Sequence, residues 1–160
     1  MKLLGLLLAL VFVALVFPAF ANETLYFRDD LAANVSVPGS TATTIITRSI
    51  TMPTSIGPWR IRAHYGIIAG GDAISNTAWE FWVDDQQSSN NLFADRGAFF
   101  PTGCSCAFAG SGISRNTYAA GTTVTFLLRV RIIGGANTVF TGYGSGVVAK
   151  THLELVVEPD

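Results

Sequence analysis

The stretch GPWRIRAHYG, Gly57 to Gly66, is the most regular in the chain. Apolar residues alternate there with cationic ones: Trp59, Ile61, Ala63 and Tyr65 against Arg60, Arg62 and His64. A period of two residues predicts a β-strand with one buried face and one outward face. The cationic face is then either a surface for an acidic partner or the solvated side of a sheet.

Similar segments recur along the chain, each bounded by Gly, Pro, Asn or Asp. The clearest are TATTIITRSITM (41–52), AWEFWVDD (78–85), TTVTFLLRVRII (122–133) and VVAKTHLELVVE (147–158), with shorter candidates in ETLYF, NVSVP and LFADRGAFF. No helical period and no strand–helix alternation follows residue 21. Eight or nine short strands predict an all-β fold, an antiparallel β-sandwich of jelly-roll type. The segment PTGCSCAFAGSGISRN (101–116) has no long apolar run, and we expect a loop there.

Strand alternation also predicts which side chains form the core. We expect these to face inward: Trp59, Ile61, Tyr65, Phe126, Leu128, Val130, Leu153 and Leu155. The opposite faces would leave Leu127, Val148 and Val156 exposed in a monomer, which favours a partner surface. Trp79 and Trp82 lie on opposite faces of their strand, so one can be core while the other reaches solvent or a partner.

Residues 1–21 have the features of a secretory signal peptide. Lys2 is followed by an uncharged apolar run, Pro18, and the small-x-small pattern that ends at Ala21, after which we expect cleavage. The segment is also just long enough for an uncleaved helical membrane anchor. A hydrophobic arm buried in an assembly is the third alternative. The β-sandwich domain would then occupy residues 22–160.

The sequence contains no recognisable catalytic constellation. His64 and His152 are the only histidines, and each lies on the polar face of an expected strand, as a solvated side chain would. The pair Asp84–Asp85 lies at a strand end, where we expect a turn. We therefore predict a protein that is not an enzyme and that carries no cofactor or metal ion.

Cys104 and Cys106 are the only cysteines, and their spacing leaves several states open. Alternate strand residues lie near the reach limit of a disulfide. The alternatives are a strained local disulfide, intermolecular bonds in an oligomer, and buried thiols.

The arginines of two expected strands are candidates for a binding face. Arg60, Arg62, Arg129 and Arg131 would form one basic ladder if their strands pair; together with His64 and Trp82 they form the candidate subunit interface or ligand face. The alternative is a solvated face balanced by Glu154 and Glu158. A formal net charge of -1 gives no general attraction to nucleic acid, and we expect none as a partner.

Residues 34–160 resemble the β-sandwich modules of tailed-phage fibre, head-fibre and capsid-decoration proteins. The resemblance lies in TATTIITRSITMPTSIGPWRIRAHYG, AWEFWVDD, NTYAAGTTVTFLLRVRIIGG and AKTHLELVVEPD, in that order. It implies a structural or receptor-binding subunit without enzyme activity, commonly a homotrimer, that contacts other virion proteins or a surface glycan.

A signal peptide departs from that class, because virion proteins assembled in the host cytoplasm normally lack one. A virion that contains a membrane would reconcile the two. The expected location is the virion surface or, through export, the extracellular space. The second hypothesis is a secreted or cell-surface binding module, such as an adhesin or a carbohydrate-binding domain, and the membrane is a partner only if residues 1–21 remain attached.

Overall fold

The computed structural model describes residues 24–55, 57–70, 77–86, 92–100, 106–133, 136–143 and 149–160. Every regular element in this part is a β-strand. The strands are β1 (Leu25–Asp30), β2 (Val35–Pro38), β3 (Thr43–Thr51), β4 (Trp59–Gly70), β5 (Thr77–Asp84), β6 (Leu92–Phe100), β7 (Cys106–Ile113), β8 (Thr123–Ile133), β9 (Ala136–Phe140), β10 (Gly142–Tyr143), β11 (Ala149–Lys150) and β12 (His152–Pro159). The segment 1–21, with the expected helix and the cleavage after Ala21, lies outside the described residues.

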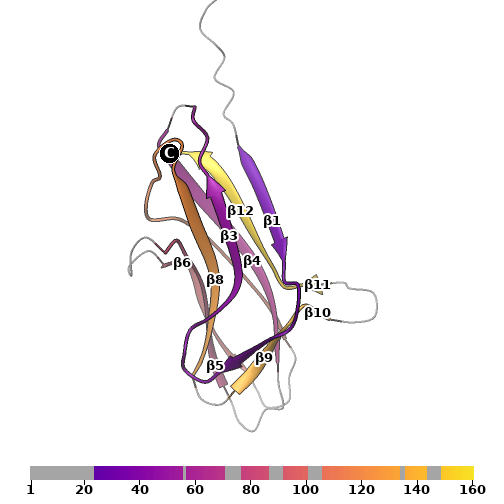
Figure 1. The fold of residues 1–160 in the computed structure, drawn as a ribbon. Coiled ribbons are helices and arrows are strands. Elements are labelled where there is room, and N and C mark those ends of the chain that lie inside the picture. The colour runs from indigo at the N-terminus through magenta and orange to yellow at the C-terminus, as the bar shows by residue number, and fades with distance from the viewer. Residues whose placement is uncertain are drawn as a thin grey trace, which may run out of the picture.

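The long strands form two antiparallel sheets, which we call sheet A and sheet B (Figure 1). Sheet A has the order β1-β12-β4-β9-β2, and β7 pairs with the other edge of β4. Sheet B has the order β3-β8-β5-β6. The rows β1-β12-β4-β7 and β3-β8-β5-β6 have the strand order of an eight-stranded jelly roll, which agrees with the all-β antiparallel expectation.

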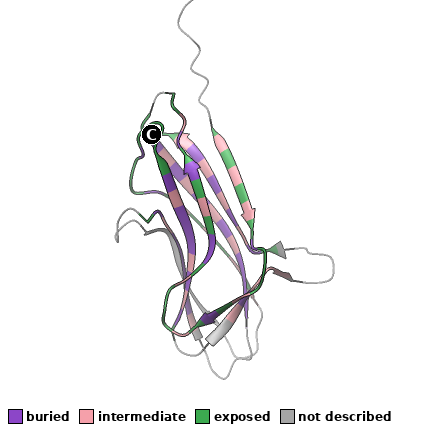
Figure 2. Cartoon of the chain, viewed as in Figure 1, coloured by how far each residue is buried: buried purple, intermediate pink, exposed green. Residues whose placement is uncertain are grey.

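Strand β4 has the alternation that its sequence predicts. Trp59, Ile61 and Tyr65 are at most 2% exposed, whereas Arg60 and Arg62 are only half-buried. Figure 2 shows the same banding of buried and partly exposed residues along the long strands. The apolar side chains point toward sheet B and the cationic ones point away from it.

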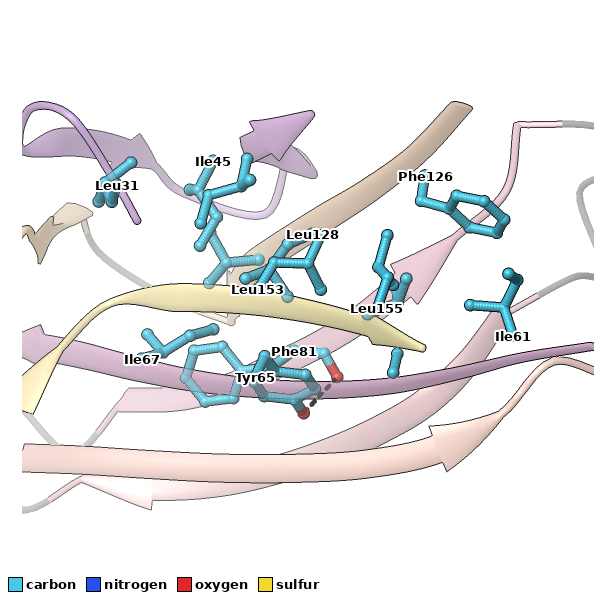
Figure 3. Close-up of a cluster of buried hydrophobic side chains, with 14 of the residues drawn as sticks. Leu31, Ile45, Ile61, Tyr65, Ile67, Phe81, Phe126, Leu128, Leu153 and Leu155 are labelled. Atoms are coloured by element: carbon cyan, nitrogen blue, oxygen red, sulfur yellow. Dashed lines mark hydrogen bonds between the residues drawn. The ribbon is translucent and has the colours of Figure 1, made fainter. Parts of the chain in front are cut away.

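The core lies between the two sheets (Figure 3). Phe126 and Leu128 of β8 lie opposite Leu153 and Leu155 of β12, and all four are at most 1% exposed. The Tyr65 hydroxyl donates a hydrogen bond to the Phe81 carbonyl oxygen at 3.4 Å, which links the sheets. All eight residues expected to face inward are buried, so that prediction is confirmed.

The prediction of a loop over residues 101–116 was wrong for the central part of that segment. Residues 106–113 form β7, which pairs with β4 from Arg62↔Ile113 to Ala69↔Cys106. The sequence lacks a long apolar run here because only Cys106 and Phe108 are large among the inner positions, and Gly110 follows them. A Cβ at Gly110 would lie 2.3 Å from Cζ of Tyr65, so the tyrosine ring occupies the space that a side chain would need.

The turn after β5 contains a buried carboxylate. The Gln86 backbone N–H donates to Asp84 Oδ1 at 2.7 Å, and Gln86 has a left-handed φ of 57°, so the expected turn is present. Asp85 is fully buried and accepts a hydrogen bond from the Tyr118 hydroxyl at 2.9 Å. Burial, together with the charge of Asp85, raises the pKa of Tyr118 well above its ordinary value.

Truncation of Phe126 to alanine tests the packing of the two sheets. We expect Phe126→Ala to lower the free energy of unfolding by about 3–5 kcal/mol, the usual cost of removing a buried phenylalanine ring. Thr47→Ala, at an exposed position of the adjacent strand β3, should change it by less than about 0.5 kcal/mol. Urea titrations followed by fluorescence give both values, and equal effects of the two variants would contradict the assigned faces.

The buried tyrosine predicts a loss of stability in alkali. The pKa of Tyr118 is raised in the folded state. Its contribution to the free energy of unfolding is therefore fully present below the pKa of an unfolded tyrosine, about 10, and is lost as the pH rises above that value. Unfolding titrations between neutral pH and alkaline pH should show a shallower decline for Tyr118→Phe than for the native protein. Identical slopes would mean that Tyr118 ionises as easily in the folded chain as in the unfolded one.

Candidate functional site

The outer face of sheet A has cross-strand rows that the register defines. In one row Asp30, His152, Gly66 and Ala109 lie side by side on β1, β12, β4 and β7. The next row contains Arg28, Glu154, His64 and Ser111. A third row contains Tyr26, Val156, Arg62 and Ile113. Since Gly66, Ala109 and Ser111 are small, the surface is hollow between the histidines and β7.

This hollow is an open groove, which we call the histidine groove. One part has a volume of about 490 Å³ and is lined by His64, Tyr65, Gly66, Ala109, Gly110, Ser111 and His152. A second part of about 350 Å³ shares Gly66, Ala109 and His152 with the first and extends to Arg28, Lys150 and Phe108. Both histidines lie on the outer face, as expected, are half-buried, and line this one groove.

His152 has the best-defined position in the groove. A Cβ at Gly66 would lie 2.6 Å from Cε1 of His152, so the imidazole lies across the glycine. Its Nδ1 is 2.8 Å from the Lys150 carbonyl oxygen. A carbonyl only accepts, so Nδ1 carries the proton and donates, which leaves a lone pair on Nε2. That Nε2 atom is 3.9 Å from Glu154 Oε1.

Two cations and two carboxylates surround this histidine. Arg28 donates to Glu154 Oε1 at 2.6 Å and to Asp30 Oδ1 at 3.1 Å. Lys150 donates to Asp30 Oδ2 at 3.0 Å. The hydrogen bond from Lys150, and then that from Arg28, hold the pKa of Asp30 below its ordinary value. The four charges cancel, so the groove carries no net charge when the histidines are neutral.

The row Ser111, His64, Glu154 brings a hydroxyl, an imidazole and a carboxylate together in the order that nucleophilic catalysis uses. The hydrogen bonds of such a triad are not formed among the described residues. Glu154 instead accepts from Arg28, and the side chains of Ser111 and His64 form no hydrogen bond with another described residue. The Glu154 carboxylate is therefore paired with Arg28 rather than with His64.

The four arginines do not form the basic ladder that the sequence allowed. Strand β4 belongs to sheet A and β8 to sheet B, so the two arginine pairs lie on opposite outer faces. Each guanidinium has a carboxylate partner near its own strand. Arg60 pairs with Asp160, just after β12, and Arg62 pairs with Glu158 of β12 at 3.0 Å. Arg129 pairs with Asp84 at 3.5 Å and Arg131 pairs with Glu80, both on β5. The expected partner Glu158 is thus confirmed for Arg62, whereas Arg129 and Arg131 use carboxylates of β5.

The apolar residues that we expected on the outer face of β5 and β8 are not exposed. Trp82 is 8% exposed and Leu127 is 3% exposed. Trp82 lies at a β-bulge, where the pairing of β5 with β6 shifts between Phe81 and Val83. The prediction that Trp82 belongs to an open ligand face was therefore wrong. Val156 is half-buried, and the side chain of Val148 lies outside the described residues.

Only one cysteine can be placed. Cys106 is half-buried at the start of β7 and packs against the core. Cys104 lies outside the described residues, so the alternatives for the pair stay predictions. None of the described segments forms an apolar helix of the length that a bilayer crossing requires.

No protein-family model and no curated protein matches this chain. Solved structures do match. The tripod from the baseplate of bacteriophage Tuc2009 has a TM-score of 0.48 and 12% identity over 91% of this chain and 72% of that chain. The subviral particle of infectious bursal disease virus VP2 has a TM-score of 0.46 and 9% identity over 85% of this chain and 37% of that one.

A third match, the Eiger TNF of S. frugiperda, has a TM-score of 0.43 and 11% identity over 87% of this chain and 94% of that one. The matches thus include a phage baseplate protein and a viral capsid protein, which is consistent with the resemblance to phage modules. At these identities and TM-scores the likeness carries no statement about function.

Substitution of the groove's glycine tests the position of His152. We expect Gly66→Ala to displace the imidazole, because the new Cβ would lie 2.6 Å from Cε1 and 3.0 Å from Nδ1. In the native protein, nitrogen-15 spectra of the imidazoles should show His152 with its proton on Nδ1, and that signal should move in Gly66→Ala. Ala109→Ser, on the same row but on β7, is the control. Unchanged His152 signals in Gly66→Ala would contradict the packing.

Proposed function

We propose that this chain is a non-enzymatic structural subunit that associates with copies of itself through the outer face of sheet A, in a virion-surface or fibre-type assembly. The observation that carries the proposal is the row Tyr26, Val156, Arg62, Ile113. The described residues contain three exposed large hydrophobic side chains, and two of them, Tyr26 at 59% and Ile113 at 40%, lie in this row.

The charges of this face favour a partner surface whose own charges are also balanced. Arg28, Arg60 and Arg62 are each paired with a carboxylate of the same chain. A surface whose charges are balanced internally has little attraction for a highly charged partner such as nucleic acid. Because exposed apolar side chains sit between these ion pairs, a second neutral surface of the same kind is a suitable partner.

A closed ring is the arrangement that best fits such a subunit. Soluble homo-oligomers close by cyclic symmetry, because an open arrangement would continue into fibres. The paired strands β1, β12, β4 and β7 give one continuous face for the contact, and the sequence resemblance to fibre modules favours a trimer. Location on a virion surface follows from the same resemblance, and the identity of neighbouring genes would test it independently.

Two isoleucine substitutions of the same kind test the interface. Ile113 lies on the outer face of sheet A, whereas Ile133 is 53% exposed at the end of β8 in sheet B. We expect the purified protein to be a single oligomer in light scattering at micromolar concentration, and Ile113→Asp to dissociate it, because a buried unpaired carboxylate is costly. Ile133→Asp should leave the mass of the oligomer in light scattering unchanged.

Two results would contradict the proposal. A monomeric native protein would remove the association altogether. Dissociation by Ile133→Asp with no effect of Ile113→Asp would place the contact on the other sheet.

A further inference from the structure

We propose that Glu154, together with His64 and His152 of the histidine groove, forms a binding site for a divalent transition-metal ion such as Zn²⁺ at the edge of that groove. The proposal goes beyond self-association, since the three ligands come from one chain. Two imidazoles, a carboxylate and one open position form a common ligand set for zinc.

The sheet register places the three side chains on one surface. His152 and Glu154 are two residues apart on β12 and therefore share the outer face. His64 lies directly opposite Glu154 on β4. Residues directly opposite each other in antiparallel strands have Cβ atoms about 4.5–5.5 Å apart, and diagonal neighbours remain within reach of long side chains. A histidine and a glutamate are both long enough to meet above this row.

His152 is already prepared as a ligand. Its Nδ1–H donates to the Lys150 carbonyl oxygen at 2.8 Å, which orients the ring and leaves the Nε2 lone pair available. Metal-bound histidines typically donate their second ring N–H in this way. Nε2 and Glu154 Oε1 are 3.9 Å apart. With zinc bonds of about 2.1 Å, two ligands of a tetrahedral ion lie about 3.4 Å apart, so a small closing movement is sufficient.

Glu154 has the outer partner that ligating carboxylates usually have. Arg28 donates to Oε1 at 2.6 Å and fixes the direction of the carboxylate. Arg28 and Lys150 are balanced by Asp30 and Glu154, so the two cations do not leave a net positive site. The Glu154 side chain is 21% exposed and that of His152 is 22% exposed, which leaves both within reach of an ion from solution.

His64 is the ligand that must move. Within the described part of the chain, no three histidine, cysteine, aspartate or glutamate side chains already converge on a point that could hold a metal ion. The His64 side chain has no hydrogen bond to another described residue, so its ring can turn toward Glu154 without breaking one. Gly66 and Ser111 beside it are small, and the groove of about 490 Å³ leaves room for the water that would occupy the fourth position.

Zinc titration of the full chain by calorimetry, after removal of bound metal with a chelator, tests the site. We expect one ion per chain. Because loss of an outer partner alone typically costs about 10–100-fold in affinity, loss of a ligand itself in His64→Ala, His152→Ala or Glu154→Gln should weaken binding by more than that factor. Glu158→Gln is the matched control, since Glu158 lies on the same face of β12 and pairs with Arg62.

Cobalt spectra and a dissociated variant distinguish this site from a site with cysteine ligands and from a site formed between subunits. Co²⁺ should give tetrahedral d–d bands without a thiolate charge-transfer band, and these should persist in Cys104→Ser/Cys106→Ser and in Ile113→Asp. Retained bands in Ile113→Asp would show that the site does not depend on association. Thermal unfolding without metal checks that each variant is folded.

The opposite results would overturn the proposal. These are no zinc binding by the native protein, equally weak binding by all variants, a spectrum with sulfur ligands, or loss of the bands in Ile113→Asp.

Discussion

The pairing of β4 on both of its edges is the constraint on which the structure depends. Residues 59–66 bond to β12 on one side, and residues 62–69 bond to β7 on the other. A strand held on both edges has its register fixed, and a slip of one residue would exchange its faces. Trp59, Ile61 and Tyr65 would then point to solvent and Arg62 into the core, so the alternation of β4 determines the outer surface as well as the core.

Glycine has a separate role on each side of this three-stranded unit. Gly110 leaves room beneath β7 for the ring of Tyr65, which reaches across the core to the Phe81 carbonyl oxygen. Gly66 leaves room on the opposite surface for the ring of His152. One glycine thus permits the inner packing and the other creates the floor of the histidine groove. The core and the groove are two sides of the same strands.

The sequence predicts the fold better than the site, for a physical reason. Alternation identified β4, β8 and β12 because their inner faces carry large side chains that recur every second residue. Strand β7 was missed because its pattern, from Cys106 through Phe108 to Gly110, includes positions that must be small. The groove could not be predicted without β7. The alternation of Cys106 and Phe108 with Ala107 and Ala109 was the available signal.

The sequence allowed all four arginines on one surface because it does not reveal which distant strands pair. Arg62 and Arg129 have the same local pattern, and only the sheet order places one on sheet A and the other on sheet B. Once placed, each finds a carboxylate on an adjacent strand of its own sheet, Glu158 for Arg62 and Asp84 for Arg129. Exposed ion pairs of this kind contribute little to stability. Their effect is instead to balance the charges of both outer faces, as the pair of Arg28 with Glu154 does beside the histidine groove.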